Sequence, residues 1–552
     1  MGQEEIKSNM DMGETSSGGS KYVDCPEAIG LEPVASSVTP SGLQRKLQAR
    51  HIQMIAIGSN IGTGLFIGSG KALHTGGPLS LVLAFFLIAI SLTIMMQCLG
   101  EMAVVIPVSG SFTRYATRFY DPALGFAMGW QYWLAWIAVF GAESSAFVLL
   151  INFWDMNPAL TPLWISIFLV INLMIHLAPV RVFGEVEFFV SALKVVAVVT
   201  FIIVVWAIMG GAGPTGHKHG GEFWRLEGLD HGIHNGFKGL AAVFVTAAFA
   251  VGGTEMVGVV AGEAQHPRHN LPRAIRTLMW RIFIFYIVSM LFLTFVVPYN
   301  EPGLIGTTNA NSSPFVLAIK DAGIQVLPHI FNAVVMVCVC SVGSTSIYIS
   351  SRTLQAMSED GFAWSFFGRV DRRGRPYVAL IFSGAMATVL AYLNCSSTGA
   401  IVFSWFSAIS GMAFFIAWLV IIASNWRFRA ALKAQNDDTL DRRFAFKQIL
   451  FPWLSIFAFV AISFMVVCQF IVSVWPIGAE PSASNFFSNF IGVPIFLIMW
   501  AGYKILYRTK WKKLTEVDLQ TGRREEDPTE IDILEVHAAM TTKEKIMSYF
   551  HF

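Results

Sequence analysis

Long apolar runs dominate this chain of 552 residues and restrict its fold more than any other feature. A helix needs about 20 apolar residues to cross roughly 30 Å of hydrocarbon, and about twelve runs of that kind follow residue 50. Only 13% of the residues are charged, whereas soluble domains carry about a quarter. The sequence therefore predicts an all-α integral membrane protein with about 12 transmembrane helices, at 52–72, 79–104, 124–152, 161–178, 185–210, 239–260, 276–299, 327–357, 377–394, 399–424, 449–475 and 486–507.

The remaining segments are short or polar, so three parts are expected: an N-terminal tail at 1–50, a transmembrane domain at 51–507 and a C-terminal tail at 508–552. The first part lacks the apolar region of a signal peptide. The net charge of +2 gives no indication of a nucleic-acid partner. Most of the six cysteines lie inside apolar runs, so we expect no disulfide framework, no metal site and no cofactor.

Lysine and arginine concentrate in alternate loops, and cytoplasmic loops carry this excess. The pattern places both termini in the cytoplasm and the sequons at Asn311 and Asn394 outside. The tails are either flexible solvated segments or sites where trafficking or ubiquitin-type regulators act, with the candidate lysines Lys7, Lys21, Lys543 and Lys545. The basic loops contain Arg114 and Arg118; Arg181; Arg268, Arg273 and Arg276; Arg369, Arg372, Arg373 and Arg375; and Arg427, Arg429, Lys433, Arg442 and Arg443.

The first apolar run has four glycines between Gly58 and Gly68. An unpaired backbone group in lipid costs several kcal/mol, so a helix break there needs partners from protein or a water-filled cavity. The second half of a broken helix begins with free N–H groups and a positive dipole end, which suit a carboxylate. We predict a substrate-binding break formed by Ser59, Asn60, Ile61, Gly62, Thr63 and Gly64.

The sixth run has a matching break at Gly252-Gly253-Thr254-Glu255, and the predicted topology makes the two helices run in opposite directions. Such a pair indicates an inverted repeat with its binding site at the midplane. Carbonyls at the end of the first half suit an ammonium group, so the two breaks together predict a ligand with an amino-acid backbone. The sixth-helix contribution is Phe249, Ala250, Val251, Gly252, Gly253 and Thr254. The alternative is that these glycines only allow close helix packing.

Charged groups within the predicted helices are the next candidates. Lys194 lies about ten residues, roughly 15 Å, into the fifth helix, too deep to reach the surface easily. It is either a proton-coupling group or a structural partner of a carboxylate. Glu143 in the third helix is a candidate for substrate selectivity, for relaying a proton or for pairing with a basic residue, and Glu101 and Glu255 join Lys194 as candidates for proton coupling. Glu101 alternatively reaches the cytoplasmic interface.

The eighth helix is rich in hydroxyl groups between Cys340 and Tyr348. Ser341 and Ser344 are candidates for substrate binding because polar side chains can line a hydrated path. Serine in a membrane helix also bonds carbonyls of its own helix, so a packing role stays open.

Several short motifs follow one another in order along the chain: Ile61-Gly62-Thr63-Gly64-Leu65-Phe66; Leu99-Gly100-Glu101-Met102-Ala103 with Pro107-Val108-Ser109-Gly110-Ser111-Phe112; Gly129-Trp130-Gln131-Tyr132-Trp133; Gly184-Glu185-Val186-Glu187-Phe188; Gly253-Thr254-Glu255 with Ala261-Gly262-Glu263; Ser351-Arg352-Thr353-Leu354; and Asp518-Leu519-Gln520-Thr521-Gly522-Arg523. Through them the chain resembles the fungal, yeast-type amino-acid permeases of the amino acid–polyamine–organocation superfamily, over essentially everything after residue 45.

The resemblance implies a LeuT-like fold of 5+5 inverted repeats with interrupted helices 1 and 6, and a plasma-membrane location. It also implies that the first break holds the substrate carboxylate, the sixth holds the amine, and an aromatic at Phe249 closes over the substrate. Lys194 matches a fifth-helix lysine that stands at a sodium site in related proteins. The chain departs from the family pattern at Ser59-Asn60 and at Val251.

We therefore expect a secondary active transporter that imports amino acids by proton symport, with broad specificity for neutral ones. Its partners would be the amino-acid substrate, protons and the lipid bilayer. The alternatives are an amino-acid-sensing receptor and a polyamine or carnitine carrier of the same fold. An enzyme is not expected, because the chain has no HExxH motif, nucleophile elbow or paired catalytic carboxylates.

Overall fold

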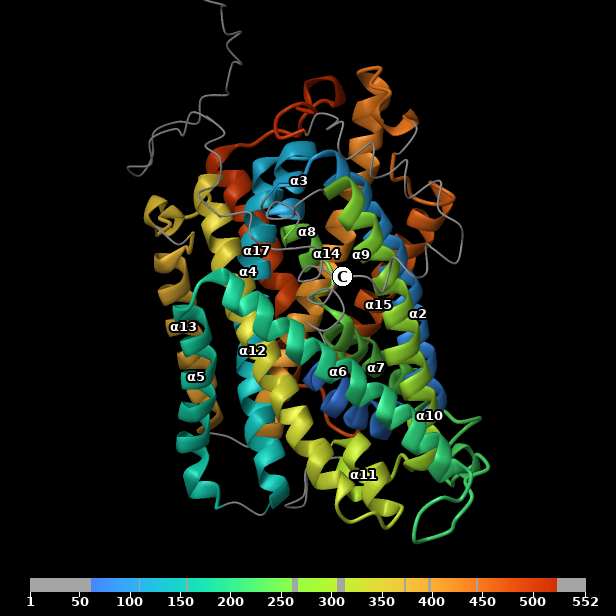
Figure 1. The fold of residues 1–552 in the computed structure, drawn as a ribbon. Coiled ribbons are helices and arrows are strands. Elements are labelled where there is room, and N and C mark those ends of the chain that lie inside the picture. The colour runs from blue at the N-terminus through green and yellow to red at the C-terminus, as the bar shows by residue number, and fades with distance from the viewer. Residues whose placement is uncertain are drawn as a thin grey trace, which may run out of the picture. The chain divides into compact units, whose positions relative to one another are not determined.

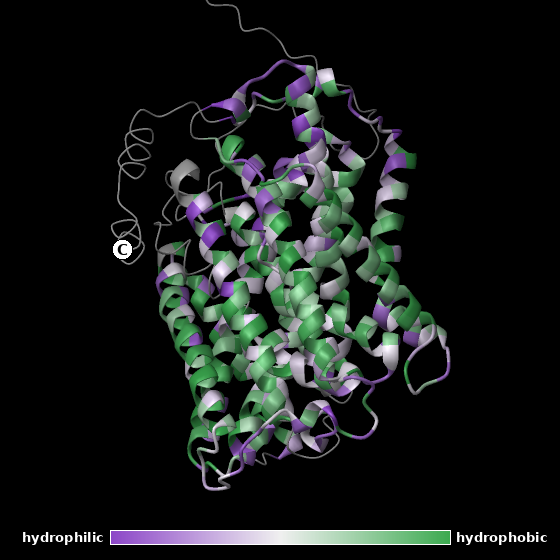
Figure 2. Cartoon of the chain, turned by 90° about the vertical axis from the view of Figure 1, so that its right-hand side faces the viewer, coloured by the Kyte–Doolittle hydropathy of each residue, from purple (hydrophilic) through white to green (hydrophobic). Residues whose placement is uncertain are grey.

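The computed structural model describes residues 61–523, apart from Ser109 and the ranges 155–156, 261–266, 305–312, 372–373, 396–398 and 443–444. These residues form helices and the turns between them, with a single isolated β-bridge between Asp230 and Ile233 and no strand in the described part (Figure 1). Hydrophobic residues fill the middle of the long helices, and hydrophilic residues lie toward both ends (Figure 2). The predicted class, an all-α membrane protein, is confirmed.

The main helices are η1 (Gly64–Gly68), α2 (Ser69–Val105), α3 (Ser111–Phe119), α4 (Pro122–Ile151), α5 (Thr161–Leu177), α6 (Val180–Met209), α7 (Gly236–Val251), α8 (Met256–Val260), α9 (Pro267–Arg281), η6 (Ile282–Val288), α10 (Ser289–Val296), α11 (Pro314–Asp321), α12 (Leu327–Glu359), α13 (Tyr377–Tyr392), α14 (Gly399–Ala434), α15 (Trp453–Val474), α16 (Ala483–Phe490) and α17 (Gly492–Tyr507). Short 3-10 turns η2 (Asn152–Trp154), η3 (Pro158–Leu160), η4 (Glu222–Trp224), η7 (Pro302–Leu304), η8 (Ser365–Gly368), η9 (Leu393–Cys395), η10 (Thr439–Asp441) and η11 (Leu514–Glu516) occur between them.

Ten helical stretches of the described chain are long and apolar enough to cross a membrane, and α16 with α17, bent by 72°, makes an eleventh. The stretch Gly64–Val105 has 42 residues, about 63 Å of helix, which is twice the thickness of the hydrocarbon. Gly77 within it has φ 79° and ψ 174°, so two helical segments meet there. The run predicted at 52–72 begins before the described residues, and the run predicted at 79–104 follows this bend.

Gly77 is a position that only glycine can occupy. Its φ is in the left-handed region, and a Cβ atom there would lie 2.8 Å from the Gly232 carbonyl oxygen and 2.8 Å from the His234 nitrogen. Pro78 follows and disfavours helical geometry at the residue before it. The chain thus turns between the first two membrane helices within one long apolar stretch.

The helices differ in how deeply they are buried. In the apolar stretch of α4, 94% of the residues are buried, against 28% in the stretch that contains α5. The α4 helix packs along α12 and α14, and α7 packs along α2 and η1. Peripheral helices expose large apolar side chains instead, such as Phe189, Trp206 and Ile381. Lipid is the natural environment of that outer surface.

Helices also form in places where the sequence predicts loops, among them α3, α11 and the end of α14. The α3 helix buries Phe112, Tyr115 and Phe119 on one face, and its two arginines hide this amphipathic pattern among the basic residues of a cytoplasmic loop. The α11 helix follows a serine cap, in which the Ser313 hydroxyl accepts the N–H of Phe315. The α14 helix continues to Ala434, ten residues beyond the apolar run, because its polar end packs against other segments of the chain.

The described start of the C-terminal tail, residues 508–523, lies against the ends of α3 and α14. The N–H of Lys512 donates to the Tyr120 carbonyl over 2.9 Å, and Arg118 Nη1 donates to the Thr521 carbonyl over 2.7 Å. Val517 and Leu519 are buried. This part of the tail is therefore packed and not free in solution, whereas the candidate lysines of both tails lie outside the described residues, as does the sequon at Asn311. The other sequon residue, Asn394, has a buried side chain.

Candidate functional site

The described segments at the two predicted helix breaks meet in space. The η1 helix begins at Gly64, and α7 ends at Val251, with α8 resuming at Met256 (Figure 1). A Cβ atom on Gly64 would lie 2.4 Å from the Cα atom of Ala250, so the two backbones touch at this point. Only glycine permits this approach. Segments almost two hundred residues apart in sequence thus form one site.

The two breaks offer opposite kinds of backbone group. The N–H groups of Leu65 and Phe66 both donate to the Gly62 carbonyl, which makes this the first bonded turn after the break. The preceding N–H groups have no partner within the helix, as at any helix N-terminus. At the end of α7, no hydrogen bond to the carbonyls of Phe249 and Ala250 is formed within the described residues. Donors and acceptors therefore lie side by side, as a zwitterion requires.

A small cavity of about 20 Å³ lies between the breaks. Most of its wall is apolar, and Glu143 is the one ionisable group among the described residues that line it. Predicted site residues and residues that the sequence did not single out both contribute, namely Gly62, Thr63, Gly64, Trp136, Val139, Glu143, Phe249, Gly252, Val342 and Phe414. Phe249 lies edge to face against Phe403 of α14, with ring centroids 5.9 Å apart.

Glu143 joins α4 to the first break. The Thr63 hydroxyl donates to its Oε1 atom over 2.7 Å, and the side chain is buried. The second oxygen, Oε2, is also buried and has no hydrogen-bond partner among the described residues. A buried carboxylate oxygen without a partner is costly, so this one is available to a ligand or a proton.

Glu255 holds the second break in shape. Its Oε1 atom accepts the N–H of Gly253 over 3.1 Å, and its Oε2 atom accepts Nε1–H of Trp418 over 3.1 Å. Gly253 has a φ of 84°, which explains the glycine at this position. The Thr254 hydroxyl donates to the Val251 carbonyl. These bonds replace the helical hydrogen bonds that the break removes.

Lys194 is fully buried in α6 and lies in a polar network with groups of its own helix and of α12. Its Nζ atom donates to Ser341 Oγ over 2.8 Å and lies 3.5 Å from Glu187 Oε1. Ser341 in turn donates to Glu187 Oε2 over 2.6 Å. Glu187, two helical turns before the lysine, is the partner that sequence reasoning missed, although it stands in one of the quoted motifs.

The α12 helix, which is the predicted eighth membrane helix, lines the cavity with an apolar residue, and the two predicted serines contact other groups. Ser341 faces the Lys194 network. Ser344 faces His176, whose Nε2 atom lies 2.9 Å from the Ser344 carbonyl oxygen and 3.3 Å from its hydroxyl oxygen. Val342 lines the cavity instead. The rotational position of α12 decides this, and periodicity in a helix that is buried on most sides does not reveal it.

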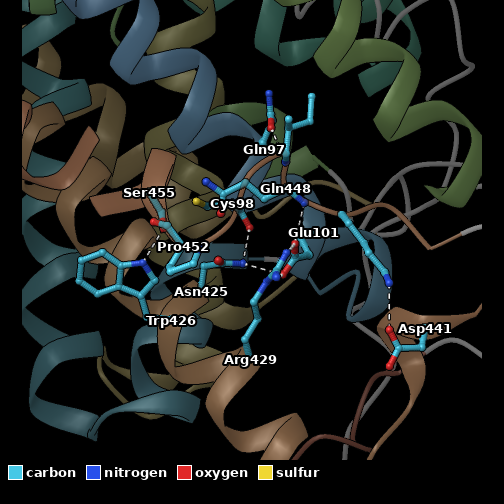
Figure 3. Close-up of polar contacts among 12 residues, drawn as sticks. Gln97, Cys98, Glu101, Asn425, Trp426, Arg429, Asp441, Gln448, Pro452 and Ser455 are labelled. Carbon is cyan, nitrogen blue, oxygen red and sulfur yellow. Dashed lines mark hydrogen bonds and ion pairs between the residues drawn. The ribbon is translucent and has the colours of Figure 1, made fainter. Parts of the chain in front are cut away.

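Glu101 lies at the other end of α2, away from the breaks, in a cluster that joins α2, α14 and the segment before α15 (Figure 3). Its Oε1 atom accepts Arg429 Nε over 2.6 Å and Asn425 Nδ2 over 3.1 Å. Its Oε2 atom accepts Arg429 Nη2 and the Gln448 N–H, the latter over 2.9 Å. Both oxygens of this buried carboxylate are therefore satisfied within the protein.

The remaining predicted site residues fall into two groups. Ser59 and Asn60 lie outside the described residues. Ile61, Ala250, Val251, Gly253 and Thr254 are buried beside the cavity but do not line it. Among the lining residues, Trp136 and Val139 were detectable only as one face of the helix that carries Glu143, at i−7 and i−4. Nothing in the sequence marks Phe414.

Known proteins are similar to this chain along most of its length. Residues 51–516 match the family described as amino acid permease. The general amino-acid permease GAP1 of Saccharomyces cerevisiae is 39% identical over 96% of this chain and 88% of its own length. Amino acid transporter 1 of Schizosaccharomyces pombe is 41% identical over 89% of this chain and 85% of its own length. The S-adenosylmethionine permease GAP4 of Candida albicans is 39% identical over 90% of this chain and 82% of its own length.

Proposed function

The chain belongs to the amino acid permease family, a family of transporters and not of enzymes, and from this premise we propose that it imports a broad range of neutral amino acids by proton symport. The observation that carries the proposal is the cavity between the two breaks, where helix-start donors and helix-end acceptors lie within one small space. The share of identical residues does not fix the substrate, because relatives with different printed substrates are about equally similar.

The binding mode follows from the two kinds of backbone group. We place the substrate carboxylate at the start of η1, near the N–H groups of residues 62–64, and the ammonium at the carbonyls of Phe249 and Ala250. The substrate side chain then faces Trp136, Val139, Val342 and Phe414. An apolar wall of this kind disfavours charged side chains, which supports a preference for neutral amino acids.

We propose that Glu143 and Lys194 couple substrate transport to the movement of a proton. Glu143 has an oxygen with no partner in the described structure, and the Lys194 network lies on the neighbouring helices α6 and α12. Glu101 and Glu255 are weaker candidates because both oxygens of each already accept hydrogen bonds. One proton entering down a membrane potential supplies about 2.3 kcal/mol per 100 mV, enough to concentrate a neutral substrate roughly fifty-fold.

Orientation and location are part of the same proposal. Basic segments distant in sequence gather at one end of the helices: Arg427 Nε donates to the Phe119 carbonyl, and the Lys512 N–H donates to the Tyr120 carbonyl. Positive residues favour the cytoplasmic side. We therefore propose that this end and both termini are cytoplasmic and that the protein lies in the plasma membrane.

Uptake of labelled amino acids by cells that lack their own permeases tests the proposal. We expect accumulation above the external concentration, stronger at acid external pH and abolished by a protonophore. A competition panel should include neutral, acidic and basic amino acids, a polyamine, carnitine and S-adenosylmethionine. Accumulation that is indifferent to the protonophore would exclude proton symport, and substrate binding without accumulation would favour a receptor.

A matched pair of glycine variants tests the site. Gly64→Val places side-chain atoms against the Ala250 backbone, where even a Cβ atom is too close, and should abolish uptake. Gly502→Val in α17 is the control, because nothing lies within 4 Å of a Cβ atom built there. Equal uptake by both variants would remove the break from the proposed site. Lys194→Ala should abolish the pH dependence, and pH-dependent accumulation at the wild-type level would exclude that residue from coupling.

A further inference from the structure

Three side chains with metal-binding chemistry gather in the connection between α6 and α7, residues 210–235, away from the two breaks in sequence. His217 Nε2 lies 3.1 Å from Glu222 Oε1, and His219 Nδ1 lies 2.8 Å from the same oxygen. One ligand atom from each residue lies within 4.8 Å of the other two. Within the described chain this is the one group of three or more such side chains with this spacing.

Two of the three distances between the ligand atoms are close to those of a tetrahedral metal site. Metal–ligand bonds of about 2.0–2.1 Å place the ligand atoms of such a site about 3.3 Å from one another. The two nitrogen–oxygen distances are already near this value. The imidazole rings lie with centroids 4.7 Å apart at an angle of 83°, and each presents a nitrogen to the same Glu222 oxygen.

Hydrogen bonds and ring contacts of the protein itself hold the backbone that carries these groups. The Gly220 N–H donates to Glu222 Oε2 over 2.8 Å, and the His219 N–H donates to the carbonyl of Met209 at the end of α6 over 3.2 Å. Trp224 stacks on Phe295 of α10 with centroids 5.8 Å apart. An ion binding here would therefore not need to order a free loop, which lowers the entropic cost of binding.

From this juxtaposition we propose that His217, His219 and Glu222 form a binding site for a divalent transition-metal ion of the zinc class. Two imidazoles and one carboxylate suit zinc, copper or nickel, whereas magnesium and calcium prefer sites built of oxygen alone. Three protein ligands leave a fourth position for water, and the side chains of His217 and Glu222 are exposed enough to admit it. The alternative is a hydrogen-bonded clasp of the loop that binds no ion.

Zinc titration of the purified full-length protein, followed by calorimetry, separates the two readings. The protein must carry an affinity tag without histidines. We expect one saturable site per chain for the wild type, and at least tenfold weaker binding for the double variant His217→Ala/His219→Ala. Glu222→Gln keeps the size of the side chain and removes its charge, so it should also weaken binding about tenfold.

The matched control is His231→Ala, which removes a highly exposed histidine of the same loop that lies outside the cluster. Its zinc affinity should equal that of the wild type. Uptake measured with a chelator present shows that each variant is folded. Absence of saturable zinc binding by the wild type would overturn the proposal, as would equal affinity of wild type and Glu222→Gln.

Discussion

Two buried glutamates of this permease, Glu143 and Glu101, have opposite environments. Glu143 lies at the cavity with one partner, the Thr63 hydroxyl, and one oxygen without a partner in the described structure. Glu101 lies at the cytoplasmic end under the proposed topology and receives four hydrogen bonds, two of them from Arg429. The sequence presents both as acids inside apolar helices.

The difference shows how to separate function from structure among intramembrane acids. A saturated carboxylate has no remaining acceptor for a substrate or proton, so its interactions are devoted to joining helices. A carboxylate left partly unsatisfied costs stability, and such a cost persists where function requires it. Removal of Glu101 should therefore damage the fold, and neutralisation of Glu143 should damage transport.

The largest expected effect is on stability, from Glu101→Ala. The substitution leaves the largely buried Arg429 without its counter-ion, and breaking a buried pair in this way costs about 3–5 kcal/mol. We expect a large loss of folded protein, measured as a lowered Tm in detergent and reduced surface expression.

A neighbouring ion pair provides the control. Asp441 pairs with Lys447 over 2.9 Å near the same cluster, but its side chain is 83% exposed (Figure 3). Asp441→Ala should therefore cost no more than about 1 kcal/mol. If both variants lower the Tm equally, burial of the Glu101 pair does not explain its importance.

The second prediction concerns transport, from Glu143→Gln. The amide oxygen of glutamine can still accept the Thr63 hydroxyl, so the Tm should change little. Uptake should fall at least tenfold and lose its dependence on external pH, because the group can no longer exchange a proton. Measuring uptake against pH for both proteins checks this. Full pH-dependent uptake by the variant would place the coupling elsewhere.

The sequence revealed much of this architecture because its signals are local. Apolar length located the membrane helices, and clustered glycine located the start of η1 and the break between α7 and α8. The partners of the charged groups were not accessible in the same way. Arg429 lies beyond the apolar run of α14, and Val342 lines the cavity in place of Ser341 and Ser344 because of the rotation of α12. Contacts between helices depend on such rotations and extensions, which one sequence does not encode locally.

Thr63→Val should affect uptake less than Glu143→Gln does. It tests the same hydrogen bond from the side of the donor, Thr63. The change removes the hydroxyl donor to Glu143 and leaves both carboxylate oxygens without a described partner. This bond contributes about 0.5–1 kcal/mol by holding the Glu143 carboxylate toward the cavity, so we expect a two- to fivefold rise in the KM for uptake. Thr63→Ser keeps the donor and is the control. Equal KM values for the two variants would show that the hydroxyl is unimportant.

The smallest effect is expected from a third kind of acid, which lies outside the membrane. Asp437 pairs with Arg523 of the packed tail over 2.6 Å. Burial acts to raise the pKa of Asp437, but hydrogen bonds from Thr439 and Arg523 hold it below its ordinary value. Because its pKa is lowered, ionised Asp437 stabilises the packed tail at pH values above the ordinary aspartate pKa near 4. This contribution disappears as the pH falls through the lowered pKa.

Asp437→Asn keeps a side-chain oxygen that can accept the hydrogen bond from Arg523 and removes only the charge, so it should loosen the tail by about 1 kcal/mol at neutral pH. Hydrogen exchange of residues 514–523 is the measurement, and it should become faster in the variant while uptake stays unchanged. The difference between variant and wild type should shrink only below about pH 4, where the wild-type carboxylate also loses its charge. A large fall in uptake would instead show that the packed tail is coupled to the transport cycle. The roles assigned to Glu101 and Glu143 do not require such coupling.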